Sequence, residues 1–218
     1  MKKAAVILLP FLILALFLSP VTAESLTGSI VTFGRWENQP LTWEILSVNG
    51  NRVLLYLEHS LPSQPYNAEN KAVTWQTCTL RAWLQDTFFQ NAFSPAEASA
   101  IVNITNENPT TYGTDGGSET VDTVFLLSRS EFEAFFPFLS DRKTTLILAP
   151  EPGAKVGTVA FVSEYDQASP YWLRSPGVDE KHAACVSWSG IIESHSVKAG
   201  DIAVRPAIWV DLSVSDIR

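Results

Sequence analysis

The sequence predicts one α+β domain with mainly antiparallel strands and two to three helices in the middle of the chain. Three observations lead to this prediction. Apolar and β-branched runs separated by turn residues fill the first and last thirds, which favours strands. Helix start signals and helical spacing are concentrated between them. The chain shows no repeat, linker or low-complexity tract, so a single globular domain over residues 24–218 accounts for it.

The first third reads as a strand meander. Asn49-Gly50 joins two apolar runs and predicts a type I′ hairpin turn, in which both turn residues take a positive φ. Leu41, Trp43 and Ile45 then share one buried face, because side chains alternate along a strand. The strands predicted in this region cover 29–34, 41–48 and 52–57.

The middle of the chain changes to helical spacing. Apolar residues between 78 and 88 recur at three- and four-residue steps. Residues 94–97 combine a serine cap, a proline at the first helical position and a glutamate at the third. Residues 128–131 repeat the capping-box pattern, and Pro137 ends the helix that follows. The predicted helices cover 79–89, 95–102 and 129–136.

A polar stretch over 103–120, rich in Asn, Thr and Gly, predicts a long surface loop. Loops longer than about 12–15 residues are usually functional or disordered. Segment 140–170 is ambiguous, because glycines and prolines interrupt its apolar pieces. Ser189-Gly190 predicts a second hairpin turn. The strands predicted after the loop cover 121–127, 171–175, 183–188, 191–197 and 202–212.

The N-terminus has the pattern of a secretory signal peptide over residues 1–23. Lys2 and Lys3 precede an apolar run over 4–18, and small residues end at Ala23. The run is shorter than the roughly 20 residues that a membrane span needs, and Pro10 interrupts it. We therefore expect a secreted or extracytoplasmic protein of the cell envelope, without stable membrane insertion after cleavage.

Composition excludes several classes of protein. The chain of 218 residues is 46% hydrophobic and 17% charged, with a formal net charge of −8 that becomes −10 when Lys2 and Lys3 are removed. Such a chain is neither intrinsically disordered nor a binder of nucleic acid through a basic surface. An acidic surface instead suits a soluble extracellular protein.

Two cysteines remain after the signal peptide, Cys78 and Cys185. An even number in an oxidising compartment favours a disulfide between them. The alternative is a pair of buried free thiols, which behave as small hydrophobic side chains.

Several motifs in order resemble a bacterial extracytoplasmic domain family of unknown function. Tyr66-Asn67 is followed by the helix motif at 79–84, and the strongest match is YWLRSPG at 171–177 with VRPA at 204–207. The resemblance covers residues 29–212. It implies a distant similarity to the C-type-lectin-like fold, which formylglycine-generating enzymes share. That fold would make the protein a binding module with a variable loop region above a small sheet.

This sequence lacks the residues that these relatives use for calcium binding and catalysis. The Glu-Pro-Asn and Trp-Asn-Asp triplets of calcium-dependent lectins do not occur in this sequence. Formylglycine-generating enzymes need a reactive cysteine pair, whereas Cys78 and Cys185 are placed like a structural bridge. No Gly-x-Ser-x-Gly motif indicates a hydrolase either. We therefore expect no catalytic residue and no cofactor.

The seven tryptophans are the most informative excess in the composition. An exposed aromatic side chain can stack on a sugar ring or anchor a protein partner. Trp188, beside the predicted turn, is the first candidate for ligand contact, followed by Tyr112 in the long loop and Trp75. The tryptophans in regular apolar patterns, which we assign to the core, are Trp43, Trp83, Trp172 and Trp209.

Two arginines in apolar surroundings, Arg174 and Arg205, are interpreted as structural. A buried guanidinium normally pairs with a carboxylate or with backbone carbonyls. Glu44 and Asp122 are candidate partners.

A metal site is the remaining chemical alternative. Asp179, His182, Glu193 and His195 lie close in sequence and carry zinc-ligating groups. Their spacing matches no recognised ligand motif, and the polar edge of a hairpin explains them equally well, so no metal is expected.

These observations lead to one functional hypothesis and two alternatives. The leading hypothesis is a secreted, non-enzymatic binding module for a glycan or protein ligand at the cell envelope. The first alternative is a structural envelope protein held in a larger complex. The second is a metal-dependent enzyme whose site includes His182 and His195.

Overall fold

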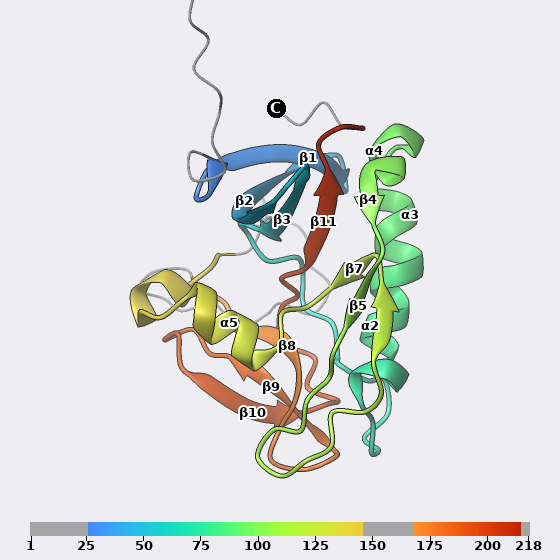
Figure 1. Ribbon diagram of the computed structural model, residues 1–218. Helices are drawn as coiled ribbons and strands as arrows, with labels where there is room; N and C mark the ends of the chain where they lie inside the picture. Colours follow the sequence, from blue (N-terminus) through green and yellow to red (C-terminus); the bar gives the residue numbers. More distant parts are fainter. Residues whose placement is uncertain (1–25, 146–167, 215–218) are drawn as a thin grey trace, which may run out of the picture.

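The largest sheet begins as the predicted N-terminal meander of three strands, β1 (Ile30–Trp36), β2 (Gln39–Asn49) and β3 (Arg52–Leu57). The computed structural model describes residues 26–145 and 168–214. The C-terminal strand β11 (Ala207–Asp211) pairs antiparallel with β3 and, on its other side, with β4 (Ile101–Val102) and β7 (Val124–Phe125) (Figure 1). The α+β class with mainly antiparallel strands is confirmed.

The turn between β2 and β3 lies one residue later than predicted. Asn49 pairs with Arg52, so the turn residues are Gly50 and Asn51. Only Gly50 has a positive φ, of 59°, which is typical of a type II′ turn with glycine at its first position. The predicted type I′ turn at 49–50 was wrong, because a register shift between Ile45 and Ser47 moves the pairing.

The predicted helices are present, with different ends. Figure 1 shows α2, α3 and α4 following one another along one side of the molecule. Capping boxes at Ser94 and Ser128 start α4 and α5, as the sequence predicts. The bounds are α2 (Thr79–Trp83), a π-helical turn (Leu84–Phe88), α3 (Phe89–Ala92), α4 (Pro95–Ala100) and α5 (Arg129–Phe135), with 3₁₀ turns at Trp75–Thr77 and Leu139–Arg142.

Two smaller sheets complete the described part of the chain. One has the order β10 (Ile192–Ser196), β9 (His182–Val186), β8 (Tyr171–Pro176). The other pairs β5 (Ile104–Asn106) with β6 (Thr120–Asp122).

The strand predicted over 121–127 is divided between two sheets. Its first part is β6 and its second part is β7. At the break, the side-chain oxygen of Gln85 accepts hydrogen bonds from the Thr123 backbone N–H and hydroxyl, each at 2.9 Å. A side chain from the helical region therefore replaces the ladder bond that a continuous strand would make.

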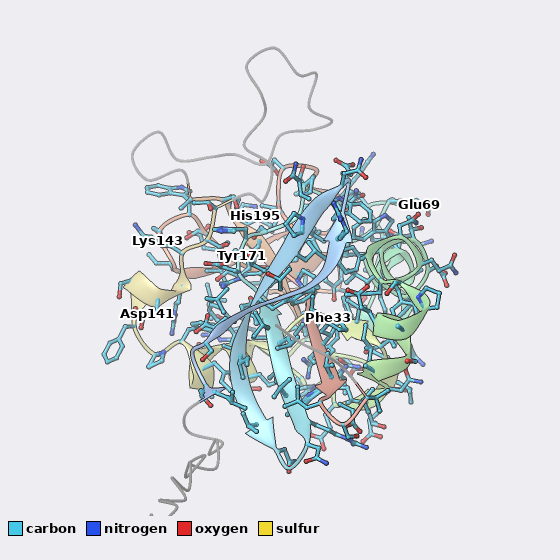
Figure 2. All side chains as sticks on the ribbon, turned by 90° about the horizontal axis from the view of Figure 1, so that it is seen from above. Phe33, Glu69, Asp141, Lys143, Tyr171 and His195 are labelled. Atoms are coloured by element: carbon cyan, nitrogen blue, oxygen red, sulfur yellow. The ribbon has the colours of Figure 1, made fainter. Side chains whose placement is uncertain are left out.

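The core lies between the large sheet, the helices and the three-stranded sheet of β8, β9 and β10. Trp43 and Trp172 are fully buried, whereas Trp83 and Trp209 are partly buried and pack against the core. Phe33, labelled in the view from above in Figure 2, packs its ring against Phe93 with centroids 5.5 Å apart.

Cys78 and Cys185 are free, buried thiols, so the structure does not contain the expected disulfide between these two described residues. The Cys78 Sγ accepts the backbone N–H of Arg81 at 3.4 Å and caps α2, while Cys185 lies in β9 beside Trp172 of β8. Burial raises the pKa of each thiol to about 12. Each cysteine is therefore a packing residue at its own position.

The predicted signal peptide, residues 1–23, lies outside the described residues, as does most of the ambiguous segment 140–170. None of the helices among the described residues has the length and apolar character needed to cross a membrane.

Gly34 provides a test of the packing between β1 and the helices. It has a φ of 76°, and an added Cβ would lie 2.7 Å from the Phe93 ring and 2.8 Å from the Ala92 carbonyl oxygen. Gly50 has a similar φ but open space around it. We expect Gly34→Ala to lower the free energy of unfolding by at least about 1 kcal/mol more than Gly50→Ala, because overpacking adds to the backbone strain. Urea unfolding followed by circular dichroism measures both, and equal losses would contradict this account.

Candidate functional site

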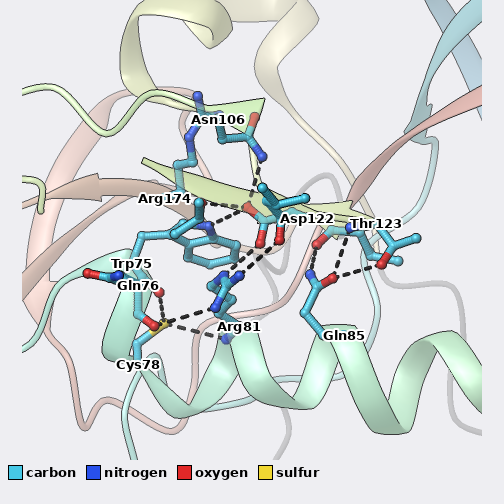
Figure 3. A network of polar contacts seen from close by, with 12 residues as sticks. Trp75, Gln76, Cys78, Arg81, Gln85, Asn106, Asp122, Thr123 and Arg174 are labelled. Carbon is cyan, nitrogen blue, oxygen red and sulfur yellow. Dashed lines mark hydrogen bonds and ion pairs between the residues drawn. The ribbon is translucent and has the colours of Figure 1, made fainter. Parts of the chain in front are cut away.

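The buried carboxylate of Asp122 anchors the long loop to the helical region (Figure 3). One oxygen, Oδ2, accepts hydrogen bonds from Trp75 Nε1 at 3.0 Å, Asn106 Nδ2 at 2.9 Å and the Thr120 hydroxyl at 2.8 Å. The other, Oδ1, pairs with Arg81 Nε at 2.6 Å. These donors come from the 3₁₀ turn, from both strands at the base of the loop and from α2. The carboxylate therefore fixes where the loop begins and ends.

Trp75 belongs to this network and not to a ligand-binding surface. Its exposed fraction is 1%, and its indole N–H is directed to Asp122. The prediction that Trp75 contacts a ligand was therefore wrong. An indole N–H that leaves water requires a polar partner, and here Asp122 provides it. The polar residues beside Trp75 in the sequence therefore did not indicate exposure.

Arg174 of β8 holds the beginning of the loop from a second side. Its guanidinium is buried and forms a two-pronged ion pair with Glu131 of α5, in which Nη2 lies 3.0 Å from Oε1. It also donates to the backbone carbonyls of Leu126 at 2.9 Å and Glu107 at 3.1 Å. Its carboxylate partner is Glu131, and not Glu44 or Asp122 as expected from the sequence.

Burial of the Glu131 carboxyl raises its pKa, but the hydrogen bonds and charge of Arg174, together with hydrogen bonds from Ser128, outweigh that effect. The net result is a lowered pKa for Glu131, so the clamp between the two side chains stays charged at neutral pH.

Arg205 is held by aromatic rings and a backbone carbonyl. Its guanidinium lies 4.1 Å from the centroid of the Tyr56 ring and about equally far, at 5.5 and 5.4 Å, from those of Phe136 and Tyr171. Its Nε donates to the Leu57 carbonyl at 2.7 Å. Glu44, the expected partner, has a raised pKa because of burial, although the Arg205 charge acts to lower it.

Tyr112 is presented at the tip of a tight turn within the long loop. Thr111 and Thr114 exchange backbone hydrogen bonds of 3.0 and 2.9 Å around the turn. Tyr112 and Gly113 both have a positive φ, of 54° and 83°, as a type I′ turn requires. The Tyr112 ring is stacked by the Arg129 guanidinium at 4.6 Å, yet its exposed fraction is 57%.

This turn forms one wall of a concavity of about 660 Å³. The opposite wall is the turn between β8 and β9. The Asp179 carboxylate in that wall accepts from the Lys181 backbone N–H at 2.8 Å and hydrogen-bonds His182 at 2.6 Å. The hydrogen bond with His182 is the main reason that the pKa of Asp179 is lowered. The lining residues are Tyr112, Gly113, Thr114, Asp115, Val178, Asp179, Glu180 and Lys181.

Trp188 lies at a different place, in the turn between β9 and β10. It is 45% exposed, and it is not among the described residues that line the Tyr112 concavity. Gly190, with a φ of 87°, and the hydrogen bond from its N–H to the Ser187 carbonyl make a three-residue loop with a glycine bulge. The structure therefore brings Trp188 and Tyr112 to separate surfaces.

The four zinc-type side chains form two separate pairs. Asp179 lies 2.6 Å from His182, and Glu193 lies 3.4 Å from His195. Within the described ranges, no group of three or more His, Cys, Asp or Glu side chains is arranged to hold a metal ion.

The fold and this site define an α+β domain that presents a concavity built on an anchored loop. The chain belongs to the family described as a domain of unknown function (DUF6273), whose model matches residues 50–212. That match begins after β1 and β2, later than the resemblance that starts at residue 29. No curated protein and no solved structure has detectable similarity to the chain.

Removal of the Asp122 carboxylate should strongly destabilise the protein. Asp122→Ala leaves Arg81, Trp75 and Asn106 without their acceptor, and breaking a buried ion pair from one side costs about 3–5 kcal/mol. Asp211→Ala, at a partly exposed carboxylate that accepts hydrogen bonds from Ser213, is the control and should cost less than about 1 kcal/mol. Chemical denaturation measures both, and similar losses would refute the anchoring role.

The Arg174–Glu131 clamp should make stability depend on pH. The pKa of Glu131 is lowered in the folded state. The clamp therefore contributes its full stabilisation above the pKa of about 4.3 that a glutamate has in the unfolded chain. This stabilisation is lost as pH falls through the lower pKa of the folded state. Glu131→Gln keeps the capping-box geometry but removes the charge. We expect the stability difference between the wild type and this variant to shrink as pH falls from 6 to 3.

Glu133→Gln, in the exposed pair with Arg129, is the matched control for that pH series and should change stability little at any pH. A stability difference for Glu131→Gln that stays constant with pH would show that the clamp does not act through charge.

Proposed function

We propose that this protein is a secreted, non-enzymatic binding module that holds a saccharide of a cell-envelope glycan in the Tyr112 concavity. The observation that carries the proposal is an exposed aromatic ring fixed beside a row of carboxylates in one concave surface. Aromatic faces stack on the apolar face of a sugar ring, and carboxylates accept hydrogen bonds from its hydroxyl groups.

The backbone of Tyr112 supports a functional role for its side chain. A bulky residue with a φ of 54° stores of order 1–3 kcal/mol of strain, and such strain persists where the surroundings impose it. Here the Arg129 guanidinium covers one face of the ring and the turn holds its backbone. The ring is thus already ordered before a ligand binds, which lowers the entropic cost of binding.

The charges of the lining favour a neutral ligand rich in hydroxyl groups. Asp115, Asp179 and Glu180 bring three carboxylates to the lining, against the single ammonium group of Lys181. An anionic ligand such as a nucleic acid would be repelled. The C-type-lectin-like fold that the sequence motifs predict, and the predicted export signal, would both suit a glycan at the cell surface.

A structural role in an envelope complex is the second candidate. It is favoured by large apolar side chains that remain exposed around the turn between β9 and β10. These are Phe138, Leu139, Trp188 and Ile191, with exposed fractions from 45% to 68%. Such patches usually contact another protein.

Glycan-array screening of the purified protein, followed by calorimetric titration of the best saccharide, tests the glycan hypothesis. We expect Tyr112→Ala to weaken binding by about tenfold or more, because the stacking platform is lost. Tyr112→Phe keeps the ring and should retain most of the affinity. Trp188→Ala, at the separate exposed tryptophan, is the matched control and should bind like the wild type.

Absence of any binder on the array at high micromolar concentration would count against a glycan function. Loss of binding in Trp188→Ala with full binding in Tyr112→Ala would move the ligand to the turn between β9 and β10.

A further inference from the structure

Strand β10 is an edge strand of the three-stranded sheet β10-β9-β8. In the described part of the chain its ladder partner is β9 alone, and Figure 1 shows it on the outer side of that sheet. An edge strand presents a row of backbone donors and acceptors that can pair with another strand.

The hydrogen bonds at both ends of the ladder show which backbone groups face outward. Ser187 N–H donates to the Ile191 carbonyl at 2.8 Å, and Val197 N–H donates to the Lys181 carbonyl at 2.9 Å. Bonded and non-bonded pairs alternate along an antiparallel ladder. Glu193 and His195 therefore bond to β9, while the backbones of residues 192, 194 and 196 point away from it.

Among the described residues, one of these outward groups already has a backbone partner. The Ser196 carbonyl accepts the Ala199 N–H at 2.9 Å. For the other outward groups, those of Ile192 and Ser194 and the N–H of Ser196, the described part of the chain provides no backbone partner. The open edge is centred on Ser194.

We propose that β10 pairs with β10 of a second copy of this chain, antiparallel and related by a two-fold axis at Ser194. The three-stranded sheets of the two copies would then form one continuous sheet. This interface goes beyond the proposed glycan site and does not depend on it.

The side chains of β10 select this register. With the axis at Ser194, Ile192 of one copy lies opposite Ser196 of the other. Glu193 of each copy lies opposite His195 of the other copy. Because residues 193 and 195 form the non-hydrogen-bonded pairs across this new edge, their side chains approach most closely. An imidazole N–H can donate to the carboxylate in either protonation state.

The neighbouring registers bring like side chains together. Shifting the pairing by two residues in one direction places Glu193 opposite Glu193 of the other copy, and directly opposed like charges are destabilising. Shifting it in the other direction places His195 opposite His195. Within one chain these two side chains already lie 3.4 Å apart and are 44% and 43% exposed. In the proposed dimer, the two Glu193 carboxylates and the two His195 imidazoles would alternate in one cluster.

The exposed side chain of Ile191 adds apolar surface at the end of this interface. It is 50% exposed, and it precedes Glu193 by two residues, on the same face of the strand. In the Ser194-centred register it lies beside the segment that follows β10 in the other copy. A symmetric pairing buries each such contribution twice.

Analytical ultracentrifugation of the purified protein over a concentration series tests the proposal. We expect a dimer for the wild type and a dissociation constant raised about tenfold or more for His195→Glu, which places carboxylates opposite each other at two positions. The exchange variant carrying both Glu193→His and His195→Glu restores the opposition and should recover the dimer. His59→Glu makes the same change of charge away from β10 and should leave the dimer intact.

A backbone variant tests the edge itself. Ser194→Pro removes the outward N–H on the two-fold axis in both copies, and proline is tolerated on edge strands. We expect this variant to be monomeric, with the circular dichroism spectrum of the wild type. A wild type that stays monomeric up to millimolar concentration would overturn the proposal. So would a dimer that His195→Glu does not weaken, a result that remains decisive even where Ser194→Pro does not fold.

Discussion

The buried Asp122 carboxylate is the constraint on which the candidate site depends. A buried charge is tolerated only where donors surround it, because its removal from water costs several kcal/mol. Those donors come from the 3₁₀ turn, from α2 and from both strands below the long loop. The helical region and the loop therefore cannot shift independently. Arg174 adds a second fixed point at Glu107, where the loop leaves β5. These two anchors fix the ends of the loop that forms one wall of the concavity beside Tyr112.

The parts of the fold that the sequence predicted well are those that local interactions determine. The capping boxes at Ser94 and Ser128 involve residues three positions apart, and both formed as expected. Strand β3 has the predicted bounds because its apolar run is continuous and ends at clear breaks. The division of 121–127 depends instead on Gln85, and the turn at Gly50 depends on a register shift within β2. Neither has a local signal, because each arises from a partner strand or helix.

The candidate site shows the same limit. The exposure of Tyr112 could be expected because the residue lies in a polar loop, and its exposed fraction is 57%. Trp75 was misassigned because polar neighbours accompany both exposed tryptophans and those with a buried polar partner, and Asp122 lies 47 positions away. The pairing of Arg174 with Glu131 spans 43 positions and was likewise out of reach. The concavity itself joins two loops that are distant in sequence, so only the folded chain brings Asp115 and Asp179 together.

The two buried thiols have a consequence for how the protein matures. A thiol attacks a disulfide only as its thiolate, and burial raises the pKa of Cys78 and Cys185 to about 12. In the folded chain, burial and the raised pKa therefore disfavour the reaction of these two thiols with oxidants and with thiol-exchange enzymes. For a chain exported as proposed, the vulnerable period is the interval between translocation and burial of these two side chains. Rapid folding, and not oxidative cross-linking, would then protect the protein from mispairing with other exported chains.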